Sequence, residues 1–327
     1  MRRDPRLALL AAALLLLAFA AARPRLDVER PAWDVLVVVD ITGSMNVRDM
    51  PAGVGGAPAS RLAATKAALA GLAARLPCAS RLGLAVFTER RPFLMISPTG
   101  LCQGFDPIVA SIEHLDWRMG WEGDSRIAAG LDRAMALAAD LGAGLVFLTD
   151  GQEAPPLRAG VPPPLETPYG TVHGVVVGVG GDTLSPIPKF DEEGREVGFY
   201  GPDDVMQETR TGAPPADASS RPGWHPRNAP WGGEATAGNE HLSSLRMAYL
   251  EQLGAATGLS VTRLTDEASL AAAIEAAVPP RSVPTPVDIA PLPAGLALAC
   301  VVLAFLGPPI AGRLAGWRRA ASVRVPS

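Results

Sequence analysis

Three stretches of this chain are almost entirely apolar, and two of them end in an aspartate. They cover residues 34–40, 144–150 and 172–179. A short run without alternating polar residues fits a strand that is buried on both faces. Because such strands occur mainly in parallel sheets with helices on both sides, these runs predict an α/β fold.

Helical patterns lie between the predicted strands. Helices are expected at 61–76, 105–115, 125–141, 245–257 and 266–277, and further strands at 82–87, 93–96 and 259–264. The first of these helices has leucines at helical spacing. This alternation of strands and helices predicts a three-layer sandwich with a mostly parallel central sheet, flanking helices and right-handed crossovers.

Oxygen-bearing side chains follow two of the predicted strands. Asp40, Thr42 and Ser44 form the pattern Asp-x-Thr-x-Ser at the end of the first strand, and Asp150 ends the second. Ser125 begins a predicted helix at the same edge of the sheet. If the two strands are neighbours in the sheet, we expect all five side chains to converge on one point.

Five oxygen ligands without nitrogen or sulfur suit a hard cation. Mg²⁺ is the first candidate, with Mn²⁺ or Ca²⁺ as alternatives, because Mg²⁺ favours octahedral oxygen coordination and keeps several waters. Gly43 is expected to permit the tight turn of the first motif. Taken singly, Thr42 and Ser44 also fit a helix cap or a turn, and Asp150 fits a turn acid.

The three-part pattern resembles the MIDAS, the metal-ion-dependent adhesion site of von Willebrand factor A domains. The resemblance covers roughly residues 33–278. It implies a von Willebrand factor A-like sandwich whose cation is completed by an Asp or Glu carboxylate of a protein partner. The family usually has Thr where this chain has Ser125, which retains the hydroxyl, and Asp124 beside it is an alternative ligand.

A narrower resemblance rests on residues 117–125, 149–156 and 186–191. These are similar to the membrane-associated MxaL/MxaC-type proteins of methanol-oxidation gene clusters. The resemblance implies a role in the assembly, maturation or calcium insertion of a periplasmic methanol dehydrogenase, a quinoprotein. The alternative that it leaves open is a generic MIDAS adhesion or scaffold protein working with a MoxR-type ATPase.

Residues beside the metal loops are candidates for contacts with the partner. We call the segments with Asp40, Ser125 and Asp150 the first, second and third metal loops. Trp117 and Trp121 precede the second metal loop and suit interface anchors, although core packing fits them equally well. Gln152 and Glu153 follow the third metal loop and are assigned to the same surface. The irregular stretch 181–239 follows the end of a predicted strand, where open α/β sheets bind ligands. We expect it to shape specificity.

The N-terminal end of the chain is hydrophobic. Residues 1–26 begin with arginines and continue without a charge from Leu7 to Ala22. This pattern is typical of a signal peptide or an N-terminal membrane anchor.

A second hydrophobic segment lies near the C-terminus. Residues 280–291 read as a Pro-rich stalk after the domain at 27–279, residues 292–312 carry no charge, and the tail 313–327 is basic. An uncharged segment of this length predicts a transmembrane helix. By the positive-inside rule we expect an inner-membrane protein with its domain in the periplasm and its tail in the cytoplasm.

Two cysteines, Cys78 and Cys102, lie in the part of the chain expected to be exported. A disulfide between them is the simplest interpretation, because disulfides persist outside the cytoplasm. Two separate buried thiols are the alternative.

Two functional classes are disfavoured by the sequence. The net charge of −4 without an internal basic cluster makes nucleic acid an unexpected partner. The histidines, at 114, 173, 225 and 241, are scattered, without the spacing of metal ligands or of a catalytic triad. We therefore expect a binding protein rather than an enzyme such as a metal-dependent hydrolase.

Overall fold

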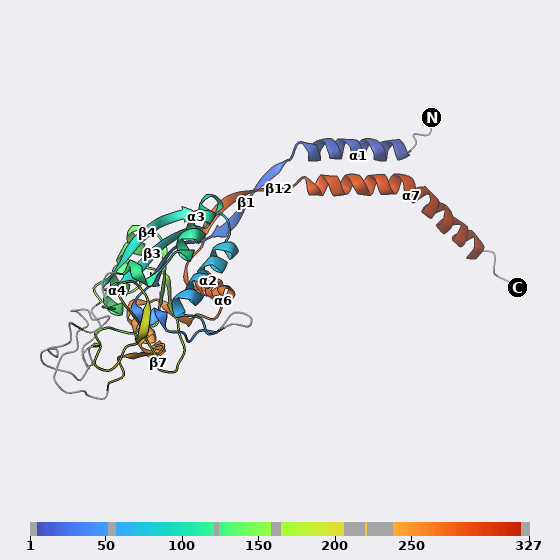
Figure 1. Ribbon diagram of the computed structural model, residues 1–327. Helices are drawn as coiled ribbons and strands as arrows, with labels where there is room; N and C mark the ends of the chain where they lie inside the picture. The colour runs from blue at the N-terminus through green and yellow to red at the C-terminus, as the bar shows by residue number, and fades with distance from the viewer. Residues whose placement is uncertain are drawn as a thin grey trace. The chain divides into compact units, whose positions relative to one another are not determined.

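The computed structural model describes residues 5–51, 57–120, 124–157, 165–205, 220 and 238–321, with only the backbone beyond residue 306. The chain forms two compact units. One unit is Pro31–Arg281, and the other combines Met1–Arg30 with Ser282–Ser327 (Figure 1). The residues expected to bind metal all belong to the first unit.

A six-stranded sheet forms the centre of the first unit, with the order β11-β6-β5-β2-β3-β4. Its strands are β2 (Asp34–Asp40), β3 (Arg81–Thr88), β4 (Arg91–Gly100), β5 (Gly144–Thr149), β6 (Gly174–Gly178) and β11 (Ser260–Arg263). Neighbouring strands run parallel, except that β4 pairs antiparallel with β3 at the edge.

The central strands are buried on both faces. Every residue of β5 is buried, as is β2 from Val35 onward. Alternate side chains of β2 enter two different cores, with Val37 in one and Val38 in the other. The apolar runs are therefore continuous because each face of the strand is covered by its own layer of helices.

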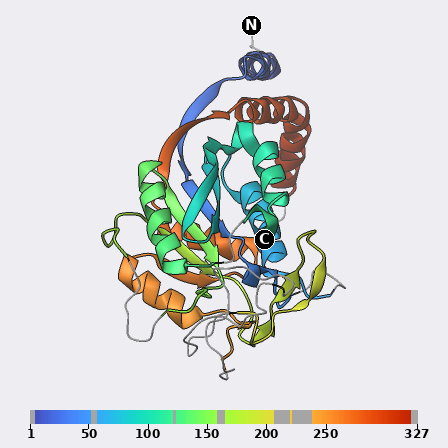
Figure 2. The same cartoon turned by 60° about the vertical axis from the view of Figure 1, so that its left-hand side comes forward.

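Helices cover both faces of the sheet. The helices are α2 (Arg61–Arg75), α3 (Leu101–Glu113), α4 (Ile127–Asp140), α5 (Met247–Thr257) and α6 (Glu267–Ala277). Leu69, Ile108 and Ile274 place α2, α3 and α6 in one core, whereas Leu131 and Leu253 place α4 and α5 in the other. Figure 2 shows α4 (green) and α5 (orange) on the side of the sheet opposite to α3 (teal). The predicted three-layer α/β sandwich is confirmed.

Capping residues explain where several helices start and stop. Ser60 accepts a hydrogen bond from the Ala63 N–H at the start of α2. Asp266 and Ser269 exchange hydrogen bonds as a capping box at the start of α6. Gly258 ends α5 with a φ of 84°, a left-handed conformation that favours glycine.

The edge of the sheet differs from the prediction. Strand β4 runs over ten residues rather than 93–96, and α3 begins at Leu101 rather than 105. Pro92 and Pro98 lie within β4. An edge strand tolerates proline because one side of its backbone has no partner strand, and this obscures the strand in the sequence.

Short strands occupy the described part of the stretch that was expected to be irregular. These are β7 (Ser185–Pro186), β8 (Pro188–Phe190) and β9 (Glu196–Phe199), with β10 (Leu242–Ser243) just after the stretch. Strand β7 pairs antiparallel with β10, and β8 with β9. Residues 206–219 and 221–237 lie outside the described residues.

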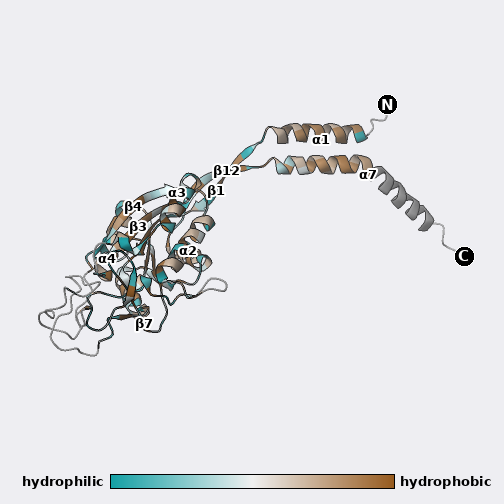
Figure 3. Ribbon diagram, in the orientation of Figure 1, coloured by the Kyte–Doolittle hydropathy of each residue, from teal (hydrophilic) through white to brown (hydrophobic). Residues whose placement is uncertain are grey.

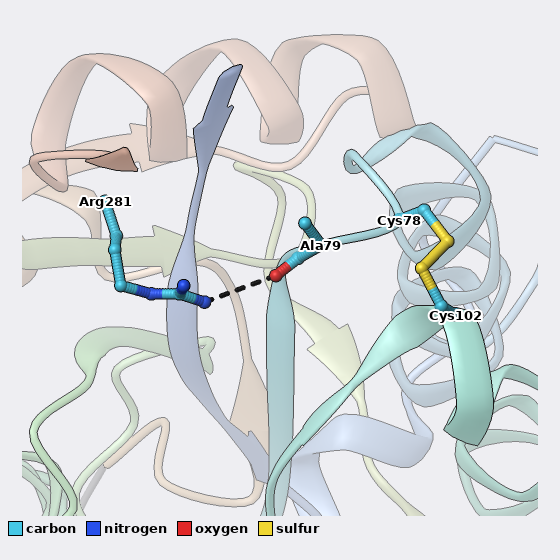
Figure 4. Close-up of a disulfide and its surroundings, with 4 residues drawn as sticks. All are labelled: Cys78, Ala79, Cys102 and Arg281. Atoms are coloured by element: carbon cyan, nitrogen blue, oxygen red, sulfur yellow. Dashed lines mark hydrogen bonds between the residues drawn. A yellow bond between two sulfur atoms is a disulfide. The ribbon is translucent and has the colours of Figure 1, made fainter. Parts of the chain in front are cut away.

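A disulfide joins Cys78 to Cys102 with a Cα–Cα distance of 4.8 Å (Figure 4). Cys78 precedes β3, and Cys102 lies in the first turn of α3. Nearby, Arg281 donates a hydrogen bond to the Ala79 carbonyl and a forked pair of hydrogen bonds to Asp34. The disulfide and these bonds tie together the end of the sheet where β2 and β3 begin.

The second unit consists mainly of two helices. Helices α1 (Pro5–Ala21) and α7 (Pro291–Ala321) lie side by side, and β1 (Arg25–Ala32) pairs with β12 (Arg281–Asp288). Figure 3 shows that α1 and the described part of α7 are predominantly apolar.

No helix among the described residues is both long and apolar enough to cross a bilayer. Helix α1 has 17 residues. At 1.5 Å per residue this is about 26 Å, short of a hydrocarbon core of about 30 Å. The prediction of an inner-membrane protein, with residues 292–312 as its transmembrane helix and a cytoplasmic tail, is therefore wrong. The end of that tail, residues 322–327, lies outside the described residues.

Candidate metal centre

The first and third metal loops emerge side by side from adjacent parallel strands. Strand β2 pairs with β5 in a register that sets Val39 opposite Leu148. The next residues are therefore neighbours, and the Thr149 hydroxyl donates a 2.6 Å hydrogen bond to Asp40 Oδ2. Because Asp150 follows directly, both predicted carboxylates lie at the same edge of the sheet, and both are fully buried.

The Asp40 carboxylate organises the first loop. Its Oδ1 accepts hydrogen bonds from the Thr42 backbone N–H, at 2.9 Å, and from the Thr42 hydroxyl, at 2.7 Å. The chain then enters a short 3₁₀ helix, η1 (Gly43–Asn46). The Ser44 hydroxyl is buried, and no hydrogen-bond partner reaches it within the described part of the chain. A buried hydroxyl without a partner is costly unless a ligand satisfies it.

Gly43 does not have the role that was predicted for it. Its φ is not in the left-handed region, and an added Cβ would meet no atom within 4 Å. The turn is made by the hydrogen bonds from Thr42 to Asp40, so the prediction that a glycine is needed at Gly43 is wrong.

The second loop brings Ser125 to the first. The Thr42 hydroxyl donates to Ser125 Oγ at 3.4 Å. The backbone of Ser125 is held by two 2.7 Å hydrogen bonds with Ala154, so the second and third loops are joined. Asp124, the alternative ligand, is also buried, and its Oδ1 has no hydrogen-bond partner among the described residues.

Asp150 is held by protein donors on both of its oxygens. Oδ1 accepts from the Gln152 backbone N–H at 2.9 Å. Oδ2 accepts from Arg61 Nη1 at 2.5 Å and from the Ser243 hydroxyl at 3.2 Å. With these donors in place, Asp150 suits a supporting position around a cation better than direct coordination.

Arg61 is the functional residue that the sequence analysis missed. Its side chain is fully buried at the first position of α2. Besides Asp150, it donates to both oxygens of Asp49 and, through Nη1, to Ser243 Oγ at 2.6 Å and the Ser44 carbonyl at 3.3 Å. It therefore links the first and third metal loops to the segment that contains Ser243.

A glycine makes room for this guanidinium. Gly180 has a φ of +132°, and a Cβ there would lie 2.7 Å from Arg61 Nε. The next residue, Gly181, donates its N–H to Asp49 Oδ2 at 2.9 Å. The start of the 181–239 stretch is thus held by the same cluster as the metal loops.

The candidate site carries excess negative charge. Burial and the neighbouring Asp150 charge raise the pKa of Asp40 to about 7, against the hydrogen bonds from Thr149 and Thr42, which lower it. Arg61 compensates Asp150 directly but makes no hydrogen bond to Asp40. A cation near the Asp40 carboxylate would relieve this repulsion.

The residues present fit a hard cation. The donors are hydroxyl and carboxylate oxygens, and one hydroxyl, Ser44, has an open lone pair. Within the described ranges there is no cluster of three or more His, Cys, Asp or Glu side chains. The hydroxyls of Thr42, Ser44 and Ser125 are therefore the ligands to be expected at this site.

Two of the predicted partner-binding residues make contacts within the domain. Trp117, in the 3₁₀ helix η2 (Trp117–Met119), stacks on Phe190 of β8 with ring centroids 4.5 Å apart. Trp121 lies outside the described residues. The buried Gln152 donates from Nε2 to the carbonyls of Glu240 and Leu242, both at 3.2 Å. Through these contacts Trp117 packs against β8, and Gln152 holds the backbone at Glu240 and Leu242.

Glu153 also points inward. Its Oε1 accepts from the Ala128 N–H at 2.9 Å, in the first turn of α4, and from the Tyr249 hydroxyl at 2.6 Å. Burial raises the pKa of Glu153 despite these hydrogen bonds. Glu153 thus connects the third metal loop with α4 and α5.

The sheet topology is that of a von Willebrand factor A-like α/β sandwich. Residues 35–152 match the family model described as von Willebrand factor type A domain. The matched range begins in β2 and ends just after Asp150, so it contains all three loops.

Several solved structures are similar to this chain at low identity. An aerotolerance-related membrane protein from Bacteroides fragilis is 16% identical over 75% of this chain and 98% of its own, with a TM-score of 0.45. The manganese-loaded TRAP protein of Plasmodium vivax is 10% identical over 81% of this chain and 82% of its own, with a TM-score of 0.36. Proximal thread matrix protein 1 from the mussel byssus, with a zinc-occupied MIDAS motif, is 15% identical over 47% of this chain and 39% of its own, with a TM-score of 0.31. No curated protein matches this chain.

Proposed function

We propose that this von Willebrand factor A-type domain binds a protein partner through a divalent cation held at its three loops. The observation that carries the proposal is the convergence of the Thr42 and Ser125 hydroxyls beside Asp40, with the Ser44 hydroxyl buried and unpartnered. Such a set suits Mg²⁺, with Mn²⁺ or Ca²⁺ as alternatives.

The hydroxyl and carboxylate residues have different roles in holding the cation. The hydroxyls of Thr42, Ser44 and Ser125 would bind it, while Asp40 and Asp150 supply the negative charge around it. When bound, the cation supplies an electrophilic position that a carboxylate of the partner can complete. Neither Asp40 nor Asp150 is free to fill that position, because donors of this chain already form hydrogen bonds to both carboxylates.

The partner proposed here is a quinoprotein methanol dehydrogenase during its assembly, maturation or calcium insertion. This finer proposal is supported by the resemblance of residues 117–125, 149–156 and 186–191 to MxaL/MxaC-type proteins. A generic adhesion or scaffold protein working with a MoxR-type ATPase would use the same cation chemistry and differ in its partner.

The metal site is tested by titrating the full-length protein with Mn²⁺ and measuring free Mn²⁺ by electron paramagnetic resonance. We expect one site, with the affinity lowered at least about tenfold in Ser44→Ala and in Asp40→Asn because each removes an oxygen ligand or its charge. Circular dichroism checks that both variants fold. Unchanged Mn²⁺ affinity in both folded variants would contradict the proposed site.

The partner is tested with purified apo-methanol dehydrogenase in a pull-down by the full-length protein. Capture is expected with Mg²⁺ and is expected to be lost with EDTA or in Asp40→Asn. Capture of equal strength in EDTA would overturn the cation-mediated mechanism. Absence of capture by a protein that binds Mn²⁺ normally would overturn the choice of partner and leave the metal site standing.

A further inference from the structure

A cavity of about 300 Å³ lies beside the second and third metal loops. It is lined by Arg90, Arg126, Ala128, Ala129, Glu153 and Leu157. Arg126 directly follows Ser125, so their Cα atoms are about 3.8 Å apart. The cavity is therefore adjacent to a residue whose hydroxyl contributes to the candidate metal site.

The two arginines of this cavity have open hydrogen-bond donors. Neither guanidinium makes a hydrogen bond with any of the described residues, and the buried Arg126 Nε has no partner. Their nearest acidic neighbour in common, Asp124, is 3.9 Å from Arg90 Nη2 and 3.6 Å from Arg126 Nε, beyond hydrogen-bond distance. Arg90 is also 3.7 Å from Glu89.

The arginines around the cavity reach solvent more than the acids do, and the Glu89 side chain is 18% exposed. The side chain of Arg90 is 57% exposed and that of Arg126 is 31% exposed, against 3% for Asp124. Glu153 is engaged by Tyr249 and by the Ala128 N–H. The surface presented to a partner therefore carries planar N–H donors that match a carboxylate, with Asp124 and Glu89 within ion-pair distance behind them.

We propose that Arg90 and Arg126 bind a second carboxylate of the same partner segment whose first carboxylate completes the cation. This inference rests on the proposed function and specifies its partner as a segment with two acidic side chains close together in sequence. The short separation follows from the adjacency of Ser125 and Arg126, because the two carboxylates must reach neighbouring residues of this chain.

The probes that test this are fluorescein-labelled Gly/Ser peptides with one Asp, or with two Asp separated by one to four residues. Binding to the full-length protein is measured by fluorescence anisotropy with saturating Mg²⁺ and with EDTA. The variants are Arg90→Gln alone and Arg90→Gln with Arg126→Gln. The control is Arg133→Gln, because Arg133 is exposed on α4 and does not line the cavity. Mn²⁺ titration of each variant separates effects on the metal from effects on the peptide.

In the wild type we expect at least one of the two-Asp peptides to bind at least about tenfold more tightly than the one-Asp peptide. This is the gain in affinity expected from one additional charge-assisted hydrogen bond. The double variant should reduce this advantage to within about twofold while leaving the one-Asp peptide and Mn²⁺ affinity unchanged, and Arg133→Gln should change nothing.

An advantage that persists in the double variant would overturn the inference, as would equal binding of all peptides in the wild type. In either case Mg²⁺-dependent binding of the one-Asp peptide would leave the proposed function intact. Loss of all Mg²⁺-dependent peptide binding in the wild type would overturn both.

Discussion

At the scale of single residues, Arg61 decides how the candidate site is held together. A positive charge at the first position of a helix opposes the helix dipole. Arg61 is nevertheless fully buried there, because Asp49 and Asp150 compensate its charge. That unfavourable position was the only signal in the sequence, and it could not identify partners that lie 12 and 89 residues away.

Replacing Arg61 with Leu should destabilise the protein by about 3–5 kcal/mol, because two buried carboxylates lose their cation. Urea unfolding in EDTA measures this effect. The control is Arg75→Leu, which breaks the exposed pair with Glu267 and should cost at most about 1 kcal/mol. A loss in Arg61→Leu no larger than in the control would show that Arg61 is not a structural counter-charge.

Much of the candidate site was predictable from residue pattern alone. Asp40, Thr42 and Ser125 come together as the strand-and-loop pattern indicated, and Asp150 lies at the same sheet edge. The orientation of Gln152 was not predictable, because its acceptors are carbonyls 88 and 90 residues further along the chain. Local sequence does not encode which long-range backbone groups a side chain will meet.

At the scale of elements, helix α4 positions the second loop against the sheet. Its close approach depends on Gly130, where an added Cβ would lie 2.0 Å from the ring of Phe87. Phe87 is fully buried and packs against Phe147 at 5.5 Å between ring centroids, so it has little room to move. Any shift of α4 away from β3 would also move Ser125, which lies two residues before the helix.

Gly130→Ala should therefore destabilise the protein by about 1–3 kcal/mol and weaken Mn²⁺ binding. Gly43→Ala is the matched control, because Gly43 lies inside the metal motif but has open space around it. We expect the control to stay within about 0.5 kcal/mol of the wild type. Thermal unfolding and Mn²⁺ titration test both variants, and a larger loss in Gly43→Ala than in Gly130→Ala would contradict the packing argument.

The parallel core was predictable at this scale, but the edge and the long stretch after β6 were not. Burial on both faces gives β2 and β5 an unbroken apolar signal. In contrast, β4 contains prolines and exposed positions, and β7 has only two residues. Elements that depend on pairing with a distant segment leave little periodicity in the sequence.

At the scale of the whole molecule, the disulfide and the candidate metal site lie at opposite ends of the sheet. Cys102 follows Gly100, which pairs with Arg81 at the amino end of β3. The metal loops follow the carboxyl ends of β2 and β5. The disulfide should therefore contribute to stability without influencing the cation.

Replacing Cys78 and Cys102 together with Ala should destabilise the protein by about 3 kcal/mol, as expected for a bridge that closes a short loop. The cysteines are 24 residues apart. Mn²⁺ affinity should stay within about twofold of the wild type. Urea unfolding without reductant measures the stability, and a variant that loses Mn²⁺ binding while still folded would show that the two ends of the sheet are coupled.

The most direct test of the central claim is anomalous diffraction from crystals of the full-length protein grown with Mn²⁺. We predict an anomalous peak at direct-coordination distance, about 2.1 Å, from the hydroxyls of Thr42, Ser44 and Ser125. Absence of a peak at these three hydroxyls in Mn²⁺-saturated crystals, or a peak elsewhere in the domain, would contradict it.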